Sequence, residues 1–205
     1  MLATDSRAVA FLPGEQKTYI EIQKIFRLSL RVILVTGGAG YGMLLCQELR
    51  SHIELSGLTD FDEIKEFATL YLPKQMEKIH RERGCDADRL ELQRVYFLLA
   101  GHAPQTSQNP FRFELWGSEH CNDPLHIINT GSAVAIPRQM GIEHRLSNVP
   151  ASENEMEEAE KLCESFLIKR AGESNEVGPP FYFARITATG ISIRNLERSS
   201  KNNAR

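Results

Sequence analysis

Four glycines follow a short apolar strand in the first quarter of the chain. The stretch RVILVTGGAGYGMLL, residues 31–45, runs from a predicted buried strand through Gly37, Gly38, Gly40 and Gly42 into leucines at helical spacing. A glycine-rich turn between a strand and a helix supports two kinds of chemistry. It can cradle the phosphates of a nucleotide at the helix N-terminus, or it can bring a backbone N–H close to a reacting carbonyl group.

The nucleotide interpretation depends on the similarity of ILVTGGAGYG to the first strand and loop of short-chain dehydrogenases, and three features count against it. Gly42 comes one residue early for that glycine register, and Met43 fills the position where the helix should pack on the strand. The acidic residues about 20 positions on, Glu54 and Asp60, lie in or just after a helical stretch instead of ending a strand. No tyrosine is followed four residues later by a lysine, so the usual catalytic pair of these NAD(P)-dependent oxidoreductases is missing.

A second cluster, HCNDPLH at residues 120–126, holds groups that bind metals. His120, Cys121, Asp123 and His126 are all possible ligands, but Asn-Asp-Pro is also an ordinary turn sequence. The four cysteines of the chain lie far apart without a C-x-x-C pair, which argues against a zinc ribbon and against a redox pair: Cys46, Cys85, Cys121 and Cys163. We therefore expect neither a metal nor a cofactor.

The composition excludes several classes of partner. With 24 Lys and Arg against 27 Asp and Glu, the net charge of −3 gives no basic surface for nucleic acid or for an anionic membrane. Apolar runs such as residues 32–35 are too short to span a membrane, and the first 16 residues do not resemble a signal peptide. We expect a cytoplasmic protein that binds neither nucleic acid nor membrane.

Periodicity predicts alternating groups of strands and helices. Helical spacing predicts one helix from Tyr41 to a stop at Gly57, a second within 59–84 that Pro73 should kink or split, and a third within 152–172. Period-two patterns predict strands at 93–101, 111–117, 125–131, 180–187 and 190–194. This order suits an α+β fold in which helices cover a pair of antiparallel sheets.

Five segments resemble, in order, the β subunits of 20S proteasomes, which are N-terminal-nucleophile hydrolases. They are LATDSRAV, EIQKIF, RVILVTGGAGYG, IINTGSAVAI and EVGPPFYFARITATGISI. The resemblance implies a four-layer αββα sandwich of two antiparallel sheets flanked by helices, with the first strand missing. It also implies one domain over residues 1–196, followed by a flexible polar tail at 197–205.

The resemblance also assigns roles to five residues. It makes Lys24 the lysine beside the nucleophile, Asp5 its carboxylate partner and Arg7 a structural neighbour. Gly38 would direct its N–H at the developing oxyanion, and Thr130 would replace a supporting serine. Each residue also has a plain structural interpretation: a turn acceptor for Asp5, a solvated strand end for Lys24 and a helix-entry loop for the glycines.

The chain departs from that pattern in its nucleophile and its supporting groups. Met1 stands inside what should be the second strand, and Thr4 lies on the wrong element to attack a substrate. Ser174 and Val177 occupy the places of an aspartate and a serine. We therefore expect the chain as written to lack its nucleophile. We also expect the reading frame to continue upstream of Met1 into a short β-prone segment that begins with threonine, or less favourably with serine or cysteine.

The resemblance implies a threonine peptidase subunit that hydrolyses peptide bonds inside an oligomeric chamber. Its partners would be further copies of itself, assembled into rings, and a peptide or unfolded-protein substrate. A non-catalytic ring subunit of the same fold is the first alternative. An NAD(P)-dependent oxidoreductase is a distant one.

Overall fold

The chain consists of two compact units, each assembled from separate segments. The computed structural model describes residues 1–11, 17–83, 94–104, 109–120, 123–150, 152 and 154–197. Unit 1 comprises Met1–Gln23, Gly131–Arg185 and Ser192–Arg205, and unit 2 comprises Lys24–Thr130 and Ile186–Ile191. The single domain over 1–196 stays a prediction, and residues 198–205 of the expected tail lie outside the described part of the chain.

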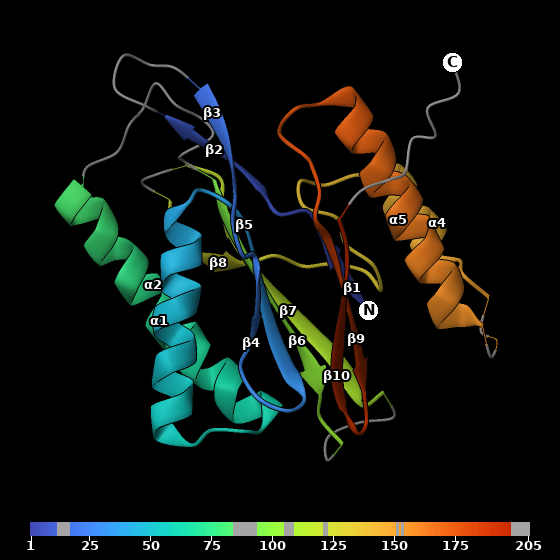
Figure 1. Cartoon of the computed structure of the whole chain (residues 1–205). Helices are drawn as coiled ribbons and strands as arrows, with labels where there is room; N and C mark the ends of the chain where they lie inside the picture. Colours follow the sequence, from blue (N-terminus) through green and yellow to red (C-terminus); the bar gives the residue numbers. More distant parts are fainter. Residues whose placement is uncertain are drawn as a thin grey trace. The chain divides into compact units, whose positions relative to one another are not determined.

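Unit 2 contains a five-stranded sheet in the order β4-β5-β6-β7-β8 (Figure 1). The strands are β4 (Ile25–Arg27), β5 (Val32–Gly38), β6 (Val95–His102), β7 (Phe111–Ser118) and β8 (His126–Ile127). Every neighbouring pair is antiparallel. The last of these strands is much shorter than the predicted 125–131.

Two helices of unit 2 follow the glycine turn. Helix α1 (Tyr41–Ser56) buries Leu45, Leu49 and Ile53 at the predicted i, i+4 spacing, and it ends at Gly57 in the left-handed conformation with φ 66°. Helix α2 (Phe61–Arg83) begins after Asp60, whose carboxylate accepts the Asp62 N–H at 2.8 Å. Since α2 continues through Pro73, the proline does not split it.

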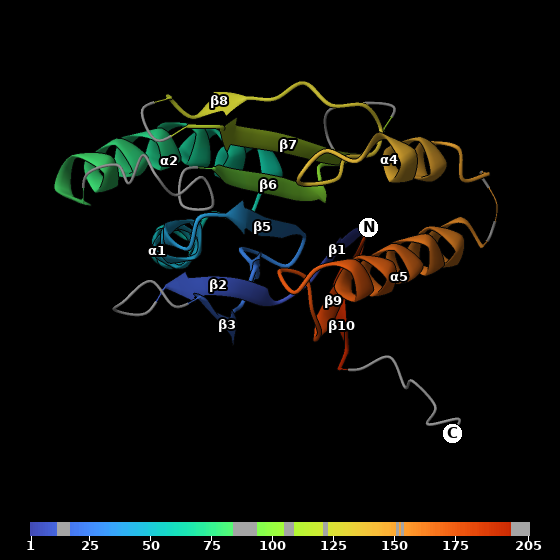
Figure 2. The same cartoon turned by 90° about the horizontal axis from the view of Figure 1, so that it is seen from above.

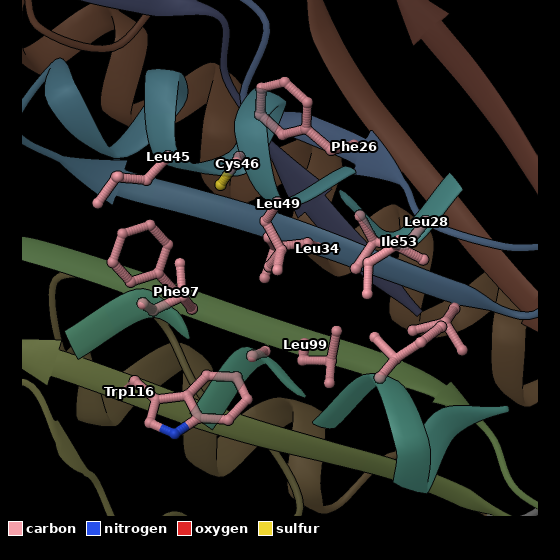
Figure 3. Packing of buried hydrophobic residues seen from close by; sticks show 14 of the residues in the cluster. Phe26, Leu28, Leu34, Leu45, Cys46, Leu49, Ile53, Phe97, Leu99 and Trp116 are labelled. Carbon is pink, nitrogen blue, oxygen red and sulfur yellow. The ribbon is translucent and has the colours of Figure 1, made fainter. Parts of the chain in front are cut away.

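The core of unit 2 lies between these two helices and one face of the sheet. Figure 3 shows Leu49 and Ile53 of α1 facing Leu34, Phe97 and Leu99 of the strands. The single tryptophan, Trp116 of β7, joins this cluster and is 2% exposed. The opposite face of the sheet also carries buried apolar side chains, among them Ile33, Leu98 and Leu115. A sheet that is apolar on both faces needs cover on both.

Unit 1 contains most of a three-stranded sheet, a hairpin and two helices (Figures 1 and 2), and the turn end of the sheet, Ile186–Ile191, belongs to unit 2. The sheet has the order β1-β9-β10, from β1 (Leu2–Thr4), β9 (Phe181–Thr187) and β10 (Gly190–Leu196). The hairpin consists of β2 (Arg7–Phe11) and β3 (Lys17–Glu21), and the helices are α4 (Met140–Ser147) and α5 (Glu155–Glu173). Helix α4 was not among the three predicted helices.

The most deeply buried residue of helix α5 is a charged one, Glu160. The Glu160 carboxylate accepts hydrogen bonds from Arg185 of β9 at 2.6 Å and from Arg194 of β10 at 2.8 Å. The Arg194 guanidinium also lies 4.5 Å from the centre of the Phe183 ring. Burial alone would raise the pKa of Glu160, but the two guanidinium donors outweigh it and hold that pKa below 4.5.

The fold is α+β, with three antiparallel sheets and four helices among the described residues. This class is the predicted one. The four-layer arrangement stays a prediction.

We expect Leu49→Ala to lower the free energy of unfolding by about 2–5 kcal/mol, because the change leaves a cavity in a fully buried cluster. The matched control is Leu55→Ala on the same helix, where the side chain is 87% exposed, and its effect should stay within about 0.5 kcal/mol. Urea unfolding of both variants measures the difference. Equal losses would contradict the packing described for α1.

We expect the stability of unit 1 to fall in acid through Glu160. Because the folded pKa of this carboxyl lies below 4.5, its contribution is complete above that pH and is lost as the pH falls through the folded pKa. Unfolding midpoints between pH 7 and pH 3 should therefore decline more steeply for the wild type than for Glu160→Gln. Glu173→Gln, at an exposed pair on the same helix, should retain the wild-type slope.

Candidate active site

Gly38 ends strand β5 in a conformation that only glycine adopts without strain. Its φ is 87°, and a Cβ atom at this position would lie 2.1 Å from the carbonyl oxygen of Arg94. The next residue, Ala39, donates its N–H to that same carbonyl at 2.6 Å. The chain therefore leaves the sheet in close contact with the start of β6, and the backbone of Gly38 itself is exposed.

The register of the sheet sets the direction of the Gly38 N–H. In the middle strand of an antiparallel sheet, successive residues direct their N–H groups alternately to the two neighbours. The Thr36 N–H donates to the Lys24 carbonyl at 3.0 Å on the β4 side, whereas the Ala39 N–H donates on the β6 side. Gly38, two residues after Thr36, therefore directs its N–H to the β4 side.

This N–H extends beyond the paired part of the neighbouring strand. Strand β4 begins at Ile25, which pairs with Val35, so its pairing ends three residues before Gly38. Lys24 immediately precedes β4 and is half-buried. The Lys24 backbone and the Gly38 N–H thus lie along the same edge of β5. An N–H group that extends past the paired part of a strand can donate to the oxygen of a ligand.

A charged group missed by the sequence interpretation lies beside this turn. The Arg94 guanidinium is 3.3 Å from the Glu119 carboxylate, and Tyr96 donates its hydroxyl to the same carboxylate. Burial, reinforced by Glu119, raises the pKa of Tyr96 to about 12. The tyrosine is therefore a hydrogen-bond donor at neutral pH and not a base. This group of three side chains could not be predicted from the sequence, because Arg94 and Glu119 meet only through the pairing of β6 with β7.

Asp5 and Arg7, the other members of the predicted constellation, belong to unit 1. The Asp5 carboxylate accepts the Arg7 N–H at 3.0 Å. This bond is the one expected if Asp5 serves only as a hydrogen-bond acceptor in a turn. The Arg7 guanidinium donates to the Asn175 carbonyl at 3.1 Å and fills the space beside Gly178, where a Cβ atom would lie 2.2 Å from Cζ. Arg7 therefore anchors the segment before β9, and the roles of both residues beside a nucleophile stay predictions.

The remaining positions take structural places. Thr130 is the half-buried last residue of the Lys24–Thr130 segment of unit 2. Ser174 ends α5, and its Oγ accepts the Glu176 N–H at 3.1 Å. Val177 is half-buried just before Gly178. None of these three provides a carboxylate.

The described residues of the cluster at 120–126 make local hydrogen bonds. The Asp123 N–H donates to the His120 carbonyl at 3.0 Å, and the Ser118 hydroxyl donates to the carbonyls of His120 and Asp123. Cys121 lies outside the described residues, as does Cys85. Within the described ranges, no group of three or more His, Cys, Asp or Glu side chains could hold a metal ion.

The two described cysteines are free thiols. Burial raises the pKa of Cys163 to about 11, and burial also raises the pKa of Cys46 well above its usual range. Both therefore stay protonated at neutral pH and are poor nucleophiles.

No protein-family model matches the chain, and no curated protein matches it either. Among solved structures, the chain is similar to Anbu from Hyphomicrobium sp. strain MC1, with a TM-score of 0.57 over 97% of this chain and 83% of that one. The two sequences are 16% identical. At that identity the similarity shows a shared fold and nothing about function.

The identification of the chain as an N-terminally truncated β subunit of the 20S proteasome was wrong. Short segments in matching order suggested it, but no family model matches, and the structural similarity at 16% identity does not reach beyond the fold. Segments of 6–18 residues can be shared by distant proteins of one fold without common membership of a family.

No helix in the described part of the chain is long and apolar enough to cross a membrane.

We expect Gly38→Ala to destabilise the protein by on the order of 1–3 kcal/mol, because its Cβ would meet the Arg94 carbonyl and its φ would be strained. Gly40→Ala is the matched control two residues on. Gly40 has φ −60°, with nothing within 4 Å of a built Cβ, so its alanine variant should unfold close to the wild type. Thermal unfolding of the pair checks this, and equal melting temperatures would contradict the turn geometry.

Proposed function

We propose that this chain is a subunit of an oligomeric hydrolase that cleaves peptide bonds, and that the Gly38 N–H binds the oxygen on which negative charge develops. The observation that supports this is the N–H of an exposed glycine directed past the paired end of β4. A donor that the fold already holds in place needs no reorganisation during the reaction. Removal of one such donor typically costs about 10²–10³-fold in rate.

Lys24 would act through its charge. A cation beside the attacking group favours its deprotonated form, which activates a hydroxyl or amine nucleophile. The nucleophile would be a threonine hydroxyl that the described residues do not supply at this edge. Thr36, two residues from Gly38, is 5% exposed and donates its hydroxyl to the Tyr96 carbonyl, so it is occupied within the sheet.

A second candidate is a non-catalytic subunit that assembles with copies of itself. Two hydroxyls of unit 1 favour it, since Thr4 donates to the Asp5 carbonyl and the Ser174 Oγ accepts the Glu176 N–H. Neither is poised for attack. Both candidates share a cytoplasmic location and association with further copies.

The distant oxidoreductase alternative is not supported by this geometry. Dinucleotides bind at the carboxyl ends of parallel strands joined by crossover helices. Strand β5, which leads into the glycine turn, pairs antiparallel on both sides.

We expect the 205-residue chain to bind an uncharged peptide at Gly38 without cleaving it. In a titration of the ¹⁵N-labelled chain, the Gly38 amide signal should move with peptide concentration. The signal of Gly57, the left-handed glycine at the far end of α1, should not. Fluorogenic peptides should show no turnover.

Two outcomes would overturn parts of this proposal. A Gly38 signal that does not move at millimolar peptide would remove the oxyanion role and favour the non-catalytic subunit. Turnover by this chain that is lost in Lys24→Ala would show that the nucleophile lies within these 205 residues.

A further inference from the structure

Strand β3 is an exposed outer strand of a two-stranded sheet. It pairs with β2 from Arg7 opposite Glu21 to Phe11 opposite Lys17, and among the residues that the structure describes no third strand joins this sheet (Figure 1). All its residues but Thr18 are exposed. A two-stranded hairpin is at best marginally stable in water by itself, so a hairpin of this kind gains stability from any strand added to its edge.

The middle of β3 is apolar on both of its faces. Tyr19 points to one face and is 41% exposed, and Ile20 points to the other and is 46% exposed. Both residues, like Thr18 beside them, belong to the types that favour strands. Proteins usually protect such an edge with a central charge, a proline or a bulge. In β3 the only charges are at its two ends, Lys17 and Glu21.

These end charges make the strand complementary to itself in one direction. When a second copy of KTYIE pairs antiparallel about a two-fold axis at Tyr19, each Lys17 faces the Glu21 of the other copy, and each Thr18 faces an Ile20. In a parallel pair in register, lysine would face lysine and glutamate would face glutamate. Charge therefore selects the antiparallel dimer.

We propose that the free edge of β3 binds β3 of a second copy of this chain, forming a four-stranded sheet across a two-fold axis. The Lys17 Nζ lies 3.9 Å from an exposed Glu176 carboxylate, and surface pairs at that distance contribute little. The inference does not depend on the proposed hydrolase function. It concerns a two-fold contact between strands and not the packing of a ring through helices.

Charge reversal tests the contact. Lys17→Glu places glutamates at both ends of the strand and Glu21→Lys places lysines at both, so each variant alone should dimerise about tenfold more weakly than the wild type in sedimentation velocity. An equimolar mixture of the two variants regains opposite charges at both contacts, and it should recover the wild-type dimer. Lys78→Glu, at an exposed pair on α2, is the matched control and should dimerise normally.

A cysteine at the two-fold axis gives an independent measurement. Tyr19→Cys should form a disulfide-linked dimer on mild oxidation, whereas Ser51→Cys, exposed on α1, should not exceed the wild-type background. The proposal is overturned if the wild type is monomeric up to 200 μM, taken as about the highest practical concentration. It is also overturned if the mixture dimerises no better than its components, or if Tyr19→Cys fails to cross-link.

Discussion

The close contact between the Gly38 backbone and the Arg94 carbonyl is the constraint on which the architecture of unit 2 depends. Because no side chain fits between them, β5 and β6 remain in register to their ends and the chain turns directly into α1. The first turn of α1 then comes equally close to the sheet. A Cβ at Gly42 would lie 2.5 Å from Thr36 Oγ1 and 2.9 Å from Val95 Cγ2. This packing explains Gly38 and Gly42 without a phosphate.

The same constraint links fold and site. A residue with a side chain at position 38 would have to move the backbone, and the N–H beyond the end of β4 would change direction with it. The structural need for glycine and the donor role proposed for its N–H therefore fall on one position. For this reason a glycine-rich segment alone does not distinguish a nucleotide site from a backbone donor.

Strong periodicity made much of this fold predictable from the sequence. Leu45, Leu49 and Ile53 mark the buried face of α1, and runs rich in apolar and aromatic residues mark β6 and β7. The failures occur where burial is weak. Helix α4 buries only Ile142 and Glu143, and β3 is exposed on both faces. Neither segment therefore has the periodic pattern of apolar residues from which a helix or strand is predicted. The segment LATDSRAV forms two strands, because Asp5 and Ser6 turn the chain between β1 and β2.

The candidate site was only partly accessible to sequence reasoning. Gly38 and Lys24 could be named from their order in the chain, but the edge that they share follows from the pairing of β4 with β5. Arg94, Tyr96 and Glu119 carry no local pattern and meet through strand register. The shared order of short segments did not establish family membership.

The position of Trp116 has a spectroscopic consequence. It is the only tryptophan of the chain, and it is buried in the core of unit 2 with its indole in a dry environment. Its emission therefore reports the loosening of that core alone. Unit 1 contains Tyr19 and Tyr182 but no tryptophan, so excitation at wavelengths that only tryptophan absorbs gives no emission from unit 1. Fluorescence and circular dichroism recorded together would therefore follow unfolding separately, the first for the core around Trp116 and the second for the whole backbone.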